Sequence, residues 1–241
     1  MPPLLRLEGL SLGYPDRTLF RGLTMELRPG ETLAVLGANG SGKTSLIKAL
    51  LGLLAPLSGR IDWPAERLSE IGYLGQMTAF DRRFPMRVRD LAAMGAWGAG
   101  LGRPDRARVE AALAEAGIAR LAERPLHALS GGQLQRALFA RVIVQDAPVI
   151  LLDEPFAAVD QTTEDHLLAL IERWRAQGRA VILVLHDLSA VLDRCTHALL
   201  LGAGEATYGT VGEIVTEPRL VAQGYLSESQ AAWMFGRARR A

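Results

Sequence analysis

Residues 32–51 read TLAVLGANGSGKTSLIKALL, and this stretch decides the fold. An apolar run at Thr32–Leu36 comes first, a glycine-rich segment follows it, and residues 42–51 then carry apolar side chains at helical spacing. This order predicts a buried strand, a tight loop and a helix. The loop, residues 37–44, matches G-x-x-x-x-G-K-[ST] in full, a pattern whose backbone N–H groups cradle phosphate oxygens.

Eight consecutive residues form this predicted phosphate loop: Gly37, Ala38, Asn39, Gly40, Ser41, Gly42, Lys43 and Thr44. The helix that follows adds its partial positive charge, Lys43 is expected to contact the β- and γ-phosphates, and the Thr44 hydroxyl is expected to bind Mg²⁺. The chain has 25 arginines but only two lysines, Lys43 and Lys48. A lysine kept in the loop against that bias favours phosphate binding over a glycine turn that merely caps a helix.

A second strand ends in two adjacent acids. Residues 149–154 read VILLDE, and neighbouring side chains on a strand point in opposite directions, so Asp153 and Glu154 are expected to have different roles. Asp153 suits the acidic partner of Mg²⁺, and Glu154 suits the general base that activates water. Two solvated acids at a strand end would be the ordinary interpretation if the phosphate loop were absent.

Strand and helix patterns alternate along the chain, which predicts an α/β fold with a mostly parallel sheet. Further strands are expected at Leu4–Leu10, Leu23–Leu27, Ile71–Leu74, Ala180–Leu185 and Ala198–Leu201, and a helix at Thr162–Gln177. Alanine, leucine and arginine at helical spacing predict an inserted helical subdomain at 86–147. We therefore expect a nucleotide-binding core at 1–85 and 148–216, and a short C-terminal tail at 217–241.

The bulk composition narrows the possible partners. The 241 residues carry 27 basic and 26 acidic side chains, a net charge of +1, which gives no general attraction to nucleic acid. A single cysteine, Cys195, fits a reducing compartment, and no apolar stretch reaches the roughly 20 residues of a membrane span. Arg6 and Glu8 interrupt the N-terminus before a secretory signal could form. We expect a cytoplasmic protein without a nucleic-acid partner.

Residues 129–133 read LSGGQ, and with this segment the chain resembles the ABC ATPase family, whose signature opens a helix some 20 residues before the acidic strand. Serine and two glycines at a helix N-terminus can form a second anion site, and a helix cap without a ligand is the alternative. The residues concerned are Ser130, Gly131, Gly132 and Gln133. The resemblance implies a P-loop NTPase (RecA-like) core with an antiparallel N-terminal β portion, and it disfavours a P-loop kinase or GTPase. Asn39 is the only asparagine, so the guanine-reading N-K-x-D motif cannot occur.

The resemblance covers roughly residues 4–216 and implies four further roles. Tyr14 matches an aromatic that stacks on adenine, and Gln76 matches a glutamine that binds Mg²⁺ and senses the membrane partner. Asp160 matches an aspartate that acts across a dimer, although Ala158-Val159 depart from the family's S-A-L-D. His186 matches a histidine that contacts the γ-phosphate. The simpler alternatives are packing for Tyr14, a solvated polar position for Gln76 and a structural role for His186.

The family's arrangement implies ATP and Mg²⁺ between two copies packed head to tail, with the loop of one copy facing the LSGGQ segment of the other. It also implies permease subunits in the membrane, an extracytoplasmic metal-binding protein that acts through them, and a peripheral position on the cytoplasmic face of that membrane. Soluble ABC ATPases that act on DNA or ribosomes usually carry coiled-coil inserts or two cassettes, and neither is found here.

Residues 72–76 (GYLGQ), 81–91 (DRRFPMRVRDL) and 94–95 (MG) are similar to the zinc- and manganese-uptake branch of the family. This similarity places zinc first among the expected cargoes, followed by manganese and iron. Importers of haem, siderophores or cobalamin use related cassettes and stay open as alternatives, because a motor subunit does not touch the cargo.

Overall fold

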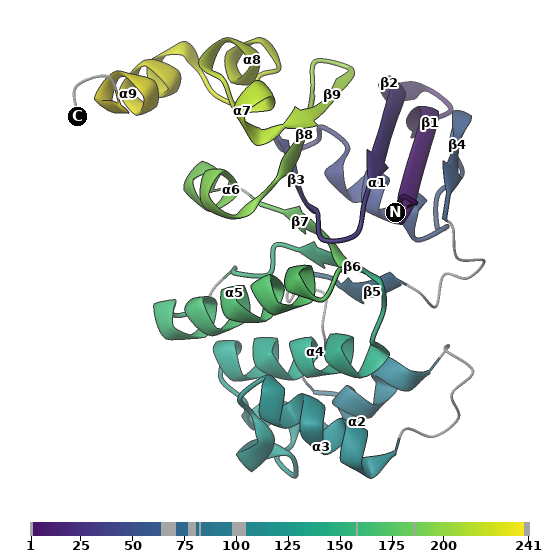
Figure 1. Cartoon of the computed structure of the whole chain (residues 1–241), viewed down its shortest axis with the longest axis vertical. Helices are drawn as coiled ribbons and strands as arrows, with labels where there is room; N and C mark the ends of the chain where they lie inside the picture. Colours follow the sequence, from purple (N-terminus) through teal and green to yellow (C-terminus); the bar gives the residue numbers. More distant parts are fainter. Residues whose placement is uncertain are drawn as a thin grey trace. The chain divides into compact units, whose positions relative to one another are not determined.

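The computed structural model describes residues 2–63, 71–76, 81, 83–97, 105–157, 159–185 and 187–238, without the side chains of residues 237 and 238. The chain divides into two compact units: unit one is Met1–Glu66 with Ile182–Ala241, and unit two is Arg67–Val181. The predicted subdomain limits at 85/86 and 147/148 follow another division and stay a prediction. Figure 1 gives the element labels used below.

Unit one begins with an antiparallel sheet. Strand β1 (Leu5–Tyr14) pairs with β2 (Arg17–Leu27) on one side and with β4 (Ser58–Asp62) on the other. Leu7 faces Met25 and Ile61 in the two registers. Apolar residues of β1 and β2 are buried, so this sheet has its own hydrophobic face. The antiparallel N-terminal portion expected from the family resemblance is therefore present.

A second sheet of unit one carries the predicted phosphate loop. Strand β3 (Thr32–Gly37) pairs in parallel with β8 (His197–Gly202), and β9 (Glu205–Thr210) pairs antiparallel with β8. The order is β7-β3-β8-β9, where β7 (Ala180–Val184) starts in unit two and ends in unit one. All six residues of β3 are buried, which agrees with the apolar run read from the sequence.

Five helices complete the described part of unit one: α1 (Lys43–Leu50), α6 (Leu188–Arg194), α7 (Val211–Ile214), α8 (Glu217–Ala222) and α9 (Glu228–Ala238). The end of α8 packs against the end of β8, where any side chain on Gly202 would overlap the backbone carbonyl of Gln223. The Gln223 side chain adds a hydrogen bond of 2.5 Å from Nε2 to Thr207 Oγ1 on β9. Residues beyond 216, expected as a tail, therefore include a helix that is anchored to the sheet.

Unit two combines parallel strands with the predicted helical insert. Strand β5 (Ile71–Leu74) pairs in parallel with β6 (Val149–Asp153), beside which β7 begins. The α-helices are α2 (Val88–Ala93), α3 (Arg106–Glu115), α4 (Gly131–Gln145) and α5 (Gln161–Ala176), with short 3₁₀ turns at Met94–Ala96, Ala119–Leu121 and Leu126–Ala128. Figure 1 shows α2, α3 and α4 packed together.

Helix α4 contacts both the sheet and helix α5 of unit two. Phe139 on α4 stacks on Trp174 of α5, with ring centroids 5.8 Å apart and both side chains buried. Arg141 donates to the Tyr73 carbonyl at 2.7 Å, and Gln145 donates to the Ile71 carbonyl at 2.6 Å. These contacts fix α4 against both β5 and α5, so the start of α4 has a defined place in the unit.

Among the helices that the structure describes, none is long and apolar enough to cross a membrane.

Candidate nucleotide site

The phosphate loop of unit one is closed by its glycines. Gly42 precedes α1 with a φ of 111°, a left-handed conformation that favours glycine. A side chain on Gly37 would overlap Ser41 Oγ and would lie 2.5 Å from the Leu201 carbonyl oxygen. The loop is therefore wound tightly over the end of β3, where a side chain at position 37 has no room.

Lys43 lies across the start of this loop. Its Nζ donates to the Gly37 carbonyl at 2.6 Å and to the Ala38 carbonyl at 3.2 Å. Thr44 is exposed beside it, and Ser41 Oγ is a buried hydroxyl for which no hydrogen bond is found within the described part of the chain. A cation, a hydroxyl and backbone amides thus converge on one loop, as triphosphate binding requires.

Tyr14 stands at the end of β1 with 46% of its surface exposed, and its hydroxyl is 3.3 Å from Ser45 Oγ on α1. The contact holds an exposed aromatic ring beside the helix that follows the phosphate loop. This is compatible with adenine stacking, which stays a prediction.

Three candidate residues of unit two gather at the carboxyl ends of β5 and β6. Leu74 pairs with Leu152 in the parallel register, so Gln76, Asp153 and Glu154 follow adjacent strand ends. Gln76 Nε2 donates to Glu154 Oε1 at 3.0 Å. Asp153 is 6% exposed and is the last residue of β6, whereas Glu154 is half-buried with a left-handed φ of 52°. The two acids have different surroundings because Asp153 ends the strand, whereas Glu154 has already left it.

The LSGGQ segment forms the predicted helix start. Ser130 caps α4: its Oγ accepts from the Gln133 backbone N–H at 3.3 Å, and Gln133 Oε1 accepts from the Ser130 N–H at 3.1 Å. Gly131 and Gly132 form the first turn. This reciprocal cap is the pattern of a stable helix start.

The segment also contacts the start of α5. A side chain on Gly132 would lie 3.1 Å from Thr163 Oγ1 and 3.4 Å from Asp160 Oδ2. Asp160 caps α5 by accepting from the Thr163 N–H at 2.9 Å, and hydrogen bonds from Thr163 hold the pKa of the Asp160 carboxyl below its ordinary value. The structure thus brings together two predicted site segments that are nearly 30 residues apart in the sequence.

Two predicted features lie outside the described residues: His186, expected to contact the γ-phosphate, and Ala158 of the Ala158-Val159-Asp160 segment. Two residues that matter were not predicted. Gln135 is 1% exposed and donates from Nε2 to the Pro155 carbonyl at 2.6 Å, and Arg136 donates to Thr163 Oγ1 at 3.2 Å. Other polar residues on α4, such as Gln133, Arg141 and Gln145, make these two hard to single out from the sequence.

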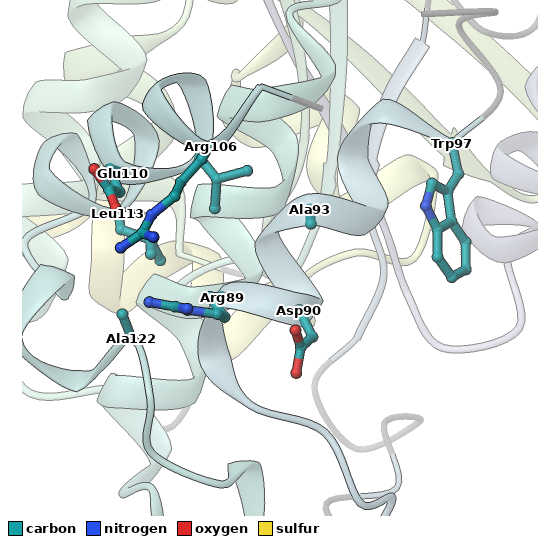
Figure 2. Close-up of a pocket in the computed structure, with 9 residues that line it drawn as sticks. Arg89, Asp90, Ala93, Trp97, Arg106, Glu110, Leu113 and Ala122 are labelled. Carbon is teal, nitrogen blue, oxygen red and sulfur yellow. Dashed lines mark hydrogen bonds and ion pairs between the residues drawn. The ribbon is translucent and has the colours of Figure 1, made fainter. Parts of the chain in front are cut away.

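Hollows are found in both units. One of about 290 Å³ lies beside the phosphate loop and is lined by Arg17, Asn39, Gly40 and Gln223, among others. The second, of about 430 Å³, lies in unit two between α2 and α3 (Figure 2). Arg106 and Glu110 form an ion pair of 2.7 Å on one side of it, and Trp97, 69% exposed, stands on the other.

The chain is similar to several known proteins over most of its length. A family model described as "ABC transporter" matches residues 20–157. The manganese transport system ATP-binding protein MntB of Halalkalibacterium halodurans is 33% identical over 234 residues, 93% of either chain. The zinc transport system ATP-binding protein TroB of Treponema pallidum is 33% identical over 221 residues, 88% of this chain and 83% of that protein. The solved structure of a protein described as a metal-chelate type ABC transporter, inward-facing, superposes with a TM-score of 0.83 at 31% identity over 93% of this chain and 90% of that one.

Proposed function

Because the chain is an ATPase of the ABC transporter family, we propose that it powers a bacterial importer of a divalent transition-metal ion, with zinc or manganese as the cargo. The observation that supports this cargo is the similarity to zinc and manganese transport subunits over nearly the whole chain. The residues after β5, which resemble the same branch in sequence, agree with it.

ATP binding is assigned to the phosphate loop and Tyr14. The loop amides and the Lys43 ammonium bind the phosphates, and the exposed Tyr14 ring stacks on adenine. Lys43 donates to two loop carbonyls, so its ammonium already lies at the loop that is proposed to hold the phosphates.

The oxygen ligands suit Mg²⁺. Asp153 supplies a buried carboxylate, Gln76 a carboxamide and Thr44 a hydroxyl, and hard oxygen donors are what this ion prefers. These residues would hold Mg²⁺ bound with ATP, and the ion would neutralise part of the phosphate charge. Glu154 accepts the proton of the attacking water, and the 3.0 Å hydrogen bond from Gln76 orients its carboxylate.

Hydrolysis requires a second copy. The Ser130–Gln133 segment starts a helix with its amides and partial positive charge, and it serves the γ-phosphate bound by the other copy. Asp160, which packs beside Gly132, acts across the same interface, and His186 contacts the γ-phosphate. Two chains therefore form a head-to-tail dimer with two ATP molecules between them.

The permease is proposed to contact the hollow between α2 and α3, and the extracytoplasmic binding protein acts through the permease. Near α2, Phe84 and Trp97 expose 58% and 69% of their surfaces. Large exposed aromatic side chains close together often mark a surface that binds a partner. In this proposal the chain is a peripheral subunit on the cytoplasmic face of the membrane. A Trp97→Glu variant should lose transport yet retain the ATPase rate of the isolated chain within about twofold. Normal transport by this variant would exclude Trp97 from the contact.

The decisive experiment measures total cellular zinc, manganese and iron by mass spectrometry in cells grown under metal limitation. It compares the native host carrying the wild-type chain with the same host carrying Glu154→Gln. We expect one metal to fall selectively, and reintroduction of the wild-type gene to restore it. Unchanged levels of all three metals, in a host without another uptake system for them, would contradict metal-ion import.

A second candidate is an importer of a metal chelate such as haem, a siderophore or cobalamin. The specific observation in its favour is the 31% identity and TM-score of 0.83 with the metal-chelate type transporter. Growth on each chelate as the sole metal source, compared between the wild type and Glu154→Gln, separates this candidate from import of the free ion.

A further inference from the structure

The segment that joins β6 to α5 carries two of the proposed functional residues, Glu154 at its start and Asp160 at its end. Glu154 has a φ of 52° and is followed by Pro155, and the Glu154 carbonyl accepts from the Ala157 N–H at 3.2 Å. A residue other than glycine stays in the left-handed region only when its surroundings hold it there. The direction of the Glu154 carboxylate therefore depends on contacts outside the turn.

Gln135 supplies such a contact at the start of the segment. Its side chain is 1% exposed, and Nε2 donates to the Pro155 carbonyl at 2.6 Å. Within the described residues, its buried Oε1 makes no hydrogen bond. Since an unsatisfied buried acceptor destabilises a protein, packing alone would favour an apolar residue at this position, and the bond to Pro155 gives the amide a reason to be there.

Arg136, the next residue on α4, makes the matching contact at the far end. Its guanidinium donates to Thr163 Oγ1 at 3.2 Å, and that hydroxyl donates to Asp160 Oδ2 at 3.2 Å. The Thr163 backbone N–H binds the other carboxylate oxygen of Asp160. All donors and acceptors of this series of hydrogen bonds lie in unit two.

We propose that Gln135 and Arg136 are positioning residues for ATP hydrolysis, which hold the two ends of the Glu154–Asp160 segment from the helix that begins with Ser130–Gln133. This inference rests on the proposed function. Neither side chain touches the nucleotide; Gln135 acts through Pro155 on Glu154, and Arg136 acts through Thr163 on Asp160. When the first turn of α4 binds the γ-phosphate held by the other copy, α4 is displaced. Gln135 and Arg136 transmit this displacement to Glu154 of the same copy, which couples the two ATP sites.

The test compares Gln135→Met with Gln145→Met in the purified chain. Both glutamines lie on α4 and donate to a backbone carbonyl at 2.6 Å, but Gln145 binds Ile71, away from the segment. We expect Gln135→Met to lower kcat about tenfold with KM for ATP within about twofold, and to reduce the Hill coefficient toward one. Gln145→Met should stay within about twofold of the wild type in all three values.

A double variant separates positioning from general damage. In a Glu154→Gln background, adding Gln135→Met should cause no further fall in the residual hydrolysis rate, because the residue that Gln135 orients is already inactive. A fall that multiplies with that of Glu154→Gln, or equal kcat for Gln135→Met and Gln145→Met, would overturn the inference. If the wild-type protein itself does not hydrolyse ATP, the proposed function fails. If the wild type hydrolyses ATP but the variants behave alike, only this inference fails.

Should Gln135→Met fold poorly, Arg136→Met against Arg141→Met gives the same comparison at half-buried positions, since Arg141 also donates from a guanidinium, to Tyr73. We expect a loss of kcat for Arg136→Met only, with partial recovery in Arg136→Lys. Equal rates for Arg136→Met and Arg141→Met would overturn the inference at this end of the segment.

Discussion

The phosphate loop of unit one and the acidic and signature residues of unit two are built in different ways. The loop is shaped by backbone: glycines at positive φ, a buried strand before it and a helix after it, with Lys43 bonded to the loop's own carbonyls. In unit two, side chains from separate elements fix the geometry, as in the Gln76–Glu154 and Gln135–Pro155 bonds. A backbone site can be recognised from contiguous residues, whereas a side-chain network becomes visible only when the elements are placed.

The contrast predicts that the largest loss of rate comes from unit two. Glu154→Gln retains the shape and the bond partner but cannot accept a proton, so hydrolysis should fall by roughly 10²–10⁴-fold while ATP still binds. The stalled chain should elute as a dimer with ATP in gel filtration. Glu164→Gln, on the first turn of α5, is the matched control. Normal turnover by Glu154→Gln would exclude the base assignment.

Substitutions in the phosphate loop should weaken ATP binding rather than slow the hydrolysis step. Lys43→Ala removes the ammonium held over the loop, and we expect ATP affinity to fall about a hundredfold, measured by equilibrium binding with labelled ATP. Lys48→Ala, the only other lysine and exposed on the same helix, should bind within about twofold of the wild type. Equal affinities for the two variants would contradict the role of Lys43.

The smallest effect concerns stability. Asp160→Ala removes the cap of α5, and we expect the Tm of the nucleotide-free chain to fall by about 2–4 °C. Because its folded pKa is lowered, Asp160 stabilises the fold above the ordinary aspartate pKa of about 3.9, and this stabilisation is lost as the pH falls through the folded value. The Tm difference should therefore be full at pH 7 and shrink below about pH 4, whereas Asp165→Ala should change little. A difference that grows in acid would show that the cap is not the cause.

The strands and helix around the phosphate loop could be predicted because their apolar runs are continuous and buried. Strands β4 and β9 could not: Ser58–Asp62 is largely exposed and Glu205–Thr210 is mostly half-buried, so neither has a clear apolar alternation. Both lie at sheet edges, where burial leaves the weakest mark on a sequence.

In the candidate site, the contiguous motifs could be recognised from the sequence, but the residues that hold them in place could not. LSGGQ identified Ser130 as a helix start, and the structure confirms the cap. Gln135 and Arg136 lie only a few residues further on, but polar side chains on a helix usually face solvent, and only the burial of Gln135 against Pro155 reveals its role. The pairing of Gln76 with Glu154 likewise depends on strand order, which short motifs do not encode.

The close approach of Gly202 to the Gln223 carbonyl has a consequence for how this chain can vary in length. Gly202 follows Leu201, whose carbonyl closes the space around Gly37, so the start of the phosphate loop and the end of α8 share one support. A residue inserted or deleted within α7 or α8 would move the Gln223 carbonyl away from Gly202 or into it. This contact therefore restricts the lengths of the two short helices that lead to Gln223, whereas additions after α9 leave it untouched.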